Sequence, residues 1–385
     1  MVEPVNNDTP LKDLYDSGQL YHVGADILRF WLVPFACFAA FGLPDRWGSL
    51  IGQFSRFAPL AFYILCGFFW AEGEDVGDET RPARTLRRTA GRFFLLFAVY
   101  LALNIAYYLL LGAPAGEMAT QLLRKRTLFN FVVLCVWPFQ MGETIWFIQS
   151  LFYVRVGLWL ADKLHLMKLY KLVMVLAFAA TLLTGELAGV VRFNFLGYSY
   201  LPANWLTCAL PYVLLGRFVY EKQARLLSLP VPAYLALFAL GVAAAYGEFT
   251  LLARYGLIAY TGHSVGFGLM ALSLCCLFLD LGTDNVDFTA AYGRKIAWRV
   301  YALSQPVALL LLFGSSFISP GLFSVVQGFG GLCVYLVCLP IASVVGLIAF
   351  RLRVRLGLAG KRVDDRQTLA EWLENENKDN KEEQP

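Results

Sequence analysis

Charged residues are scarce in this chain. Lysine, arginine, aspartate and glutamate make up 16% of its 385 residues, whereas hydrophobic residues make up 58% and the mean hydropathy is +0.57. Soluble globular domains carry about 25% charged residues. The composition therefore excludes a soluble domain, and we find no internal repeat and no nucleic-acid-binding signature in the sequence.

Long apolar runs take the place of the missing charge. Runs of about 17–25 residues recur from end to end, and each is long enough to cross about 30 Å of hydrocarbon. They predict an all-α, polytopic integral membrane protein of the plasma (inner) membrane, surrounded by the lipid bilayer. The predicted spans are 27–43, 57–71, 91–112, 145–161, 169–190, 204–220, 230–250, 264–281, 297–317 and 323–350.

A shorter apolar segment, 128–140, better fits a re-entrant or interfacial piece than a crossing. Loop charges support this interpretation, because cytoplasmic loops are enriched in lysine and arginine. With ten crossings, the basic loops at 81–92, 162–171 and 217–225, and both termini, lie in the cytoplasm. If 128–140 crossed, the basic clusters that follow it would lie outside. The basic run Arg124–Arg126 lies outside on the ten-crossing topology, and nothing in the sequence explains it.

The sequence divides into three parts. Residues 1–25 form a polar cytoplasmic lead-in, 26–355 the transmembrane domain, and 356–385 an acidic cytoplasmic tail that we expect to be partly disordered. The lead-in lacks a basic start and a small-residue cleavage site, so we expect no removable signal peptide.

Cysteine and histidine offer few candidates for chemistry. All eight cysteines fall inside apolar runs, and no spacing of cysteine and histidine suggests a disulfide framework or a metal site. Of the three histidines, His22 and His165 lie in polar segments, where we expect them to be solvated. We expect the same of the acidic residues that follow the second span, Glu72 among them.

An acid and a base stand where the first apolar span begins. Asp26 and Arg29 are three residues apart, so a helix brings them to the same face. Charges in or near a bilayer are costly and are usually retained for function. The alternative is an acid at a helix start beside an arginine that snorkels to the lipid headgroups.

Four short segments in chain order resemble motifs of the membrane-bound acyltransferase 3 family. They are Asp26–Arg29, Pro59–Phe69, Ile145–Ile148 and Tyr301–Val307. Arg87, Arg88 and Arg92 are similar to the basic run that leads into the family's third span, and Pro211–Gly216 is similar to the glycine ending of its seventh.

The resemblance implies a bundle of about ten helices around a polar cavity. It also implies transfer of an acyl group, such as acetyl, from a cytoplasmic acyl-CoA substrate, with no bound cofactor. The acceptor would be a hydroxyl or amine of an extracytoplasmic glycan or lipid-linked molecule. The implied substrate-binding residues are Asp26 and Arg29 at the inner mouth, Arg88 and Arg92 on phosphate, and Trp146, Gln149, Tyr301 and Ser304 along the cavity. For the arginines the alternative is a simple anchor to anionic lipid.

The chain departs from the family at both histidines of its motifs. Ala40 stands eleven residues after Arg29, where the family has the histidine thought to act as the base, and Ser304 replaces the second histidine. Alanine cannot transfer a proton, so the motifs assign no catalytic residue. His263 is the candidate substitute, because the predicted topology places it at the outer mouth of the eighth span; the alternative is a polar residue at headgroup level.

Two other functions fit the same fold. One is a carrier for a small solute or a lipid-linked acceptor, and the other is a catalytically inactive scaffold for a neighbouring enzyme. None of the three functions calls for a metal ion or a nucleic-acid partner.

Overall fold

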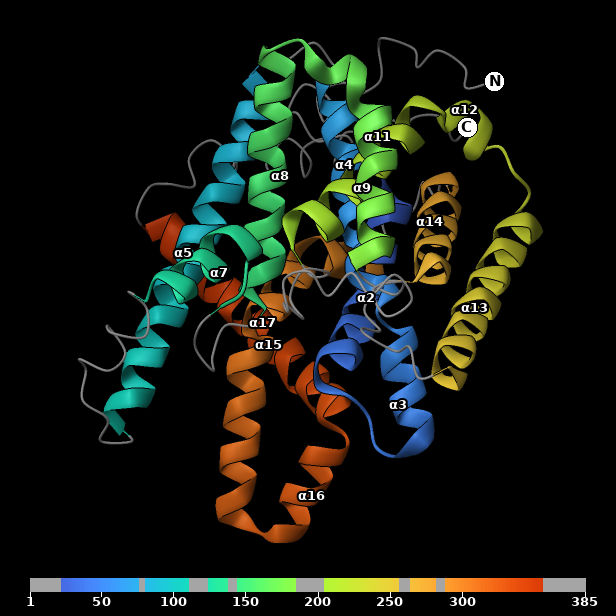
Figure 1. The fold of residues 1–385 in the computed structure, drawn as a ribbon. Helices are drawn as coiled ribbons and strands as arrows, with labels where there is room; N and C mark the ends of the chain where they lie inside the picture. Colours follow the sequence, from blue (N-terminus) through green and yellow to red (C-terminus); the bar gives the residue numbers. More distant parts are fainter. Residues whose placement is uncertain are drawn as a thin grey trace, which may run out of the picture.

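The computed structural model describes residues 22–75, 80–110, 124–137, 144–184, 204–255, 264–281 and 288–355. The regular elements in these residues are helices (Figure 1). They are α2 (Val23–Phe41), α3 (Asp45–Phe54), α4 (Phe57–Asp75), α5 (Thr80–Leu110), α7 (Lys125–Leu134), α8 (Ile145–Lys163), the 3₁₀ turn η1 (Leu166–Leu169), α9 (Tyr170–Thr184), the π-helical turn η3 (Trp205–Ala209), α11 (Leu210–Glu221), α12 (Gln223–Leu226), α13 (Val231–Arg254), α14 (Val265–Asp280), α15 (Phe288–Ile318), α16 (Pro320–Gly328) and α17 (Gly330–Arg355).

Seven helical stretches in the described part of the chain are long and apolar enough to cross a membrane. They are Val23–Phe41, Gly48–Gly73, Pro82–Leu109, Leu166–Thr184, Val231–Arg254, Ile296–Ile318 and Gly330–Ile348. Each overlaps one of the spans predicted from the sequence. The prediction of an all-helical, multi-pass membrane protein is therefore confirmed at this level.

The other three predicted spans are helical but do not meet the same test of length and composition. α14 has 16 residues, and α11 has 12 residues after the five-residue π-helical turn η3. α8 has 19 residues, but its sequence includes Arg155, Asp162 and Lys163. The count of ten crossings therefore remains a prediction.

The apolar segment 128–140 forms only a short helix. α7 has 10 residues, so its length is about 15 Å, roughly half of the hydrocarbon thickness. It ends at Cys135, whose φ of 57° lies in the left-handed region. Up to Trp137, where the described residues stop, this segment is too short to cross, in agreement with the sequence interpretation.

Glycines let several helices approach each other at backbone distance. A Cβ atom on Gly67 of α4 would lie 1.9 Å from the carbonyl oxygen of Val213 in α11, and one on Gly216 would lie 2.0 Å from the carbonyl oxygen of Ile64. Small residues at helix crossings are typical of membrane proteins. Gly67 and Gly216 belong to two of the segments that carry the family resemblance, and the fold brings these segments together.

α2 lies at the centre of the bundle, where α4, α14, α15 and α17 all contact it. Two more glycines make this possible. A Cβ on Gly293 of α15 would lie 1.9 Å from the carbonyl oxygen of Asp26, and one on Gly24 would lie 1.8 Å from that of Phe278 in α14. The charged start of α2 is therefore held between two neighbouring backbones.

A side chain from α5 supplies a hydrogen bond that a proline removes from α15. Pro306 has no N–H group, so the carbonyl of Ala302, four residues earlier, loses its helical donor. The hydroxyl of Tyr100, which is fully buried, donates a 2.9 Å hydrogen bond to that carbonyl. Next to it, the side-chain oxygen of Gln305 accepts from the backbone N–H of Thr144 at 3.2 Å. The segment Tyr301–Val307 is thus tied to both α5 and α8.

We expect Tyr100→Phe to lower the free energy of unfolding by about 1–3 kcal/mol, because the Ala302 carbonyl would be left buried without a donor. Thermal unfolding of the purified protein in detergent checks this. Tyr107→Phe, elsewhere on α5, is the matched control. An equal melting temperature for Tyr100→Phe and Tyr107→Phe would contradict a stabilising role for the hydrogen bond from Tyr100 to the Ala302 carbonyl.

Candidate functional site

The start of α2 carries a pair of opposite charges that lies against the end of α4. Arg29 forms an ion pair with Asp26 on its own helix, as the spacing predicted, and its guanidinium lies 4.8 Å from the centre of the Phe69 ring. Asp26 is only 3% exposed. An acid in the first turn also interacts favourably with the helix dipole. The acid of the pair is therefore buried in the packed bundle, whereas Arg29 is partly exposed.

The expectation that His22 and Glu72 are solvated is wrong. His22 Nε2 lies 2.8 Å from Glu72 Oε1, its ring packs edge-on against Phe68 and Phe69, and Glu72 is 6% exposed. The reason is the packing of the start of α2 against the end of α4, which brings the His22 ring onto Phe68, Phe69 and Glu72. The other carboxylate oxygen of Glu72 is buried and has no hydrogen-bond partner among the described residues.

Arginines from α2, α5 and α8 form a cluster that includes Arg29 of the Asp26–Arg29 pair. We call Arg29, Arg88, Arg92 and Arg155 the arginine cluster. Arg88 and Arg92 are one turn apart on α5, and Arg155, Arg88 and Arg29 all lie close enough to Arg92 to act on its charge. Three helices thus bring positive charge to one place in the bundle.

Arg92 and Arg155 have no carboxylate partner among the residues that the structure describes. Arg155 instead donates a hydrogen bond to the hydroxyl of Thr89, and its buried Nε has no partner in the described part of the chain. The guanidinium of Arg92 lies 5.1 Å from the centre of the Trp298 ring on α15. Like charges held together are destabilising, and a bound anion with several negative charges would offset this cost.

Guanidinium groups match the geometry of phosphate oxygens, which accept two parallel hydrogen bonds from one arginine. The sequence analysis singled out Arg88 and Arg92 for this role but missed Arg155. A signal for it was present, since Arg155 stands inside the predicted span 145–161, where an ionisable residue marks a functional site.

Aromatic rings connect the arginine cluster to the middle of the bundle. Trp298 packs against Tyr301 with 5.9 Å between ring centres, and Tyr301 packs against Phe147 at 5.4 Å. Phe147 stacks on Tyr63 at 4.4 Å. Trp146 also contacts Tyr63, with 6.3 Å between ring centres. The structure therefore groups Trp146 and Tyr301, two of the predicted site residues, around Tyr63 and Phe147.

The other two predicted cavity residues are held by hydrogen bonds. Gln149 is fully buried and donates to the carbonyl of Phe131 at 2.7 Å and to the hydroxyl of Tyr153 at 3.0 Å. Ser304 is also buried, and its hydroxyl donates to the carbonyl of Tyr301 at 2.9 Å. Gln149 therefore fastens α8 to α7, and the Ser304 hydroxyl is already used within its own helix.

The places where the family has histidines carry no base in this fold. Ala40 is exposed near the end of α2, and His263 lies outside the described residues. Ser264, the residue that follows His263, caps α14: its oxygen accepts from the Gly266 N–H at 2.9 Å, and its hydroxyl donates to the carboxylate of Glu248 on α13. The carboxylate of Glu248 is thus held beside Ser264, which is the residue next to His263 in the chain.

Within the described ranges, no group of three or more histidine, cysteine, aspartate or glutamate residues is arranged to hold a metal ion. No protein-family model matches the chain, and comparisons with curated proteins and with solved structures find none similar to it.

Proposed function

We propose that this protein is a membrane-bound acyltransferase. It takes an acyl group, such as acetyl, from a cytoplasmic acyl-CoA and passes it to a hydroxyl or amine of an extracytoplasmic glycan or lipid-linked acceptor. The observation that carries the proposal is the arginine cluster, with two guanidinium groups that lack a carboxylate partner in the described structure. Ten crossings, a polar central cavity, an inner-membrane location and cytoplasmic termini are part of the same proposal.

Coenzyme A brings phosphate groups, and the arginine cluster offers the complementary charge. Arg88, Arg92 and Arg155 would bind the phosphates, and the Trp298 ring fixes the guanidinium of Arg92. The basic residues 81–92, in the first part of α5, favour a cytoplasmic position for this part of the bundle, where acyl-CoA is found. Trp146 and Tyr301 would border the path of the acyl group toward the other side.

In the transfer step, the acceptor oxygen or nitrogen forms a bond to the acyl carbon and the carbon–sulfur bond of the thioester breaks. Coenzyme A leaves as the thiolate, and the proton of the acceptor must go to a base. His263 would take that proton. The carboxylate of Glu248, bonded to the neighbouring Ser264, supplies a negative charge close to this position in the chain.

The first experiment measures the binding of acetyl-CoA to the purified protein in detergent by isothermal titration. We expect saturable binding by the wild type and a loss of at least about tenfold in affinity, or about 1.4 kcal/mol, in the Arg88→Ala, Arg92→Ala double variant. Lys222→Ala with Arg225→Ala is the control, because it removes the same charge from exposed positions of a predicted cytoplasmic loop. Absence of binding by the wild type would overturn the donor site.

A carrier is the second candidate, and one observation favours it. The two positions where the family has histidines carry exposed Ala40 and Ser304, whose hydroxyl is already bonded to the Tyr301 carbonyl. A carrier needs the anion site but no base. Solute uptake by reconstituted vesicles, together with the absence of acyl transfer, would select the carrier. Acyl transfer that continues unchanged after His263→Ala would remove His263 from the mechanism.

A further inference from the structure

A deep apolar groove lies between α2, α3, α13 and α14. Its volume is about 820 Å³. The floor is formed by core residues that are almost fully buried, among them Leu28, Leu32 and Met270. The rim includes Trp31 on α2 and Tyr246 on α13, which are 52% and 56% exposed. Buried floor and exposed rim together define a groove that opens outward from the bundle.

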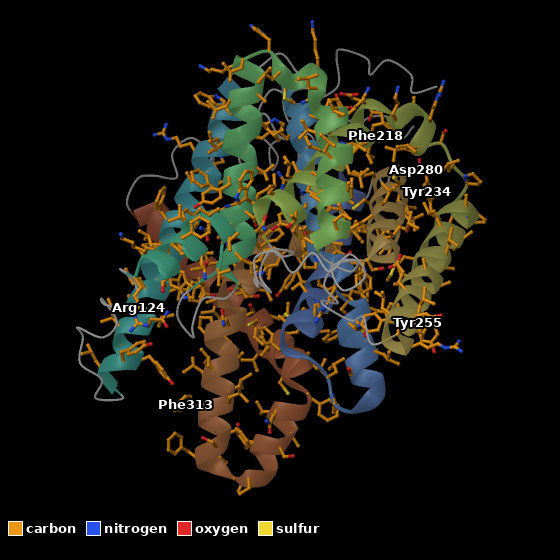
Figure 2. The ribbon with its side chains drawn as sticks, viewed as in Figure 1. Arg124, Phe218, Tyr234, Tyr255, Asp280 and Phe313 are labelled. Atoms are coloured by element: carbon orange, nitrogen blue, oxygen red, sulfur yellow. The ribbon has the colours of Figure 1, made fainter. Side chains whose placement is uncertain are left out.

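The groove lies in the part of the molecule that faces the bilayer. Both α2 and α13 are long and apolar enough to cross the membrane. Tyr234 and Asp280 mark one end of the α13–α14 pair and Tyr255 the other (Figure 2), and the groove residues of α13, 238–246, lie between these ends. On α2 and α13 the groove therefore lies at the depth of the hydrocarbon, away from the ends of these two helices. It also reaches Phe54 and Phe57, where α3 ends and α4 begins.

The groove offers almost nothing to water. Among the described residues that line it, the polar groups are the ring N–H of Trp31 and the hydroxyls of Ser55 and Tyr246. The Ser55 hydroxyl already donates to the Ile51 carbonyl at 2.6 Å. A buried water typically needs about three polar partners. Hydrocarbon, in contrast, needs none and is the surrounding solvent at this depth.

The size of the groove fits a chain rather than a gap in packing. Protein interiors leave few voids larger than a water molecule, whereas an apolar cavity of about 150 Å³ holds a benzene molecule. The groove is roughly five times larger than that cavity, which is enough for a long hydrocarbon chain. Its opening between two membrane-facing helices gives a lipid direct lateral access.

We propose that this groove binds the hydrocarbon chain of a lipid from the surrounding bilayer, as a specific site distinct from the lipid that coats the rest of the surface. The distinction follows from shape, because a chain in the groove contacts α2, α3, α13 and α14 at once. This site does not depend on the proposed acyl transfer, since none of its lining residues belongs to the arginine cluster.

The test counts lipids that stay bound after purification in mild detergent, by native mass spectrometry, with a phospholipid added as the probe. Ala239→Phe and Ala243→Phe together place bulk in the groove at exposed positions of α13. Ala102→Phe on the exposed side of α5 is the control. We expect the wild type and the control to keep one more phospholipid than the double variant.

A second measurement keeps the result independent of folding. A phospholipid with a photoreactive group in its acyl chain should label peptides of α2 and α13 around Trp31 and Tyr246 in the wild type, and this labelling should fall at least fivefold in the double variant. Equal lipid counts in all three proteins would overturn the proposal. So would labelling confined to other helices, or a second polypeptide that occupies the groove in place of lipid.

Discussion

Gly67→Ala is expected to lower the free energy of unfolding by about 3 kcal/mol. The added methyl group would sit 1.9 Å from the carbonyl oxygen of Val213, which belongs to the backbone of α11 and cannot rotate away. α4 and α11 would have to separate, and the buried contacts of Tyr63, Ile64 and Phe68 would loosen with them. Size-exclusion chromatography after stepwise heating in detergent measures the loss.

Gly157→Ala is the matched control for this substitution. Gly157 also lies inside a helix, but nothing is within 4 Å of the position that its Cβ would take. This variant should be neutral or stabilised by about 0.5–1 kcal/mol, because alanine favours a helix over glycine. Gly67→Ala and Gly216→Ala combined should cost less than the sum of the two, since separation of the helices relieves both clashes. Full additivity would contradict a shared crossing point.

Arg155→Met should have two opposite effects. Without ligand, the protein should become more stable by about 1 kcal/mol, because a buried charge and its repulsion of Arg92 are removed. With acyl-CoA, the dissociation constant should rise about 30-fold, or roughly 2 kcal/mol, because a charge-assisted hydrogen bond to phosphate is lost. Thermal unfolding with and without acetyl-CoA reports both quantities in one series.

Arg155→Lys separates charge from geometry in that series. Lysine keeps the positive charge but cannot form the planar, two-pronged contact of a guanidinium. We expect an intermediate affinity and no gain in stability without ligand. If Arg155→Met weakened the protein without ligand and left its affinity for acetyl-CoA unchanged, Arg155 would be a purely structural residue that holds Thr89.

The sequence predicted the helices better than their ends. The span 230–250 is close to α13, Val231–Arg254, because Pro230 and Pro232 set the start of the helix. The predicted span 91–112 begins well inside α5, because that helix already starts at Thr80. Hydropathy reports the part of a helix that fits hydrocarbon, and the basic residues 84–92 continue the same helix beyond it.

Contacts of the candidate site within one helix could be predicted from the sequence, whereas contacts between helices distant in the chain could not. Asp26 and Arg29 pair within one turn of a helix, so their spacing was sufficient. His22 and Glu72 are 50 positions apart in the chain, and their contact depends on the face that α4 presents to α2. Tyr100 is similar, because its partner, the Ala302 carbonyl, becomes available only through a proline on a distant helix.

The close crossing of α4 and α11 has a consequence for how the chain is made. Ribosomes deliver helices to the membrane in order, so α4 is synthesised before α5, α8 and α9, and α11 follows them. Until α11 arrives, the face of α4 around Gly67 is open to other transmembrane segments. A nascent chain halted before η3 should therefore associate with chaperones or insertion factors through this face, and should be released from them once α11 with Gly216 has entered the membrane.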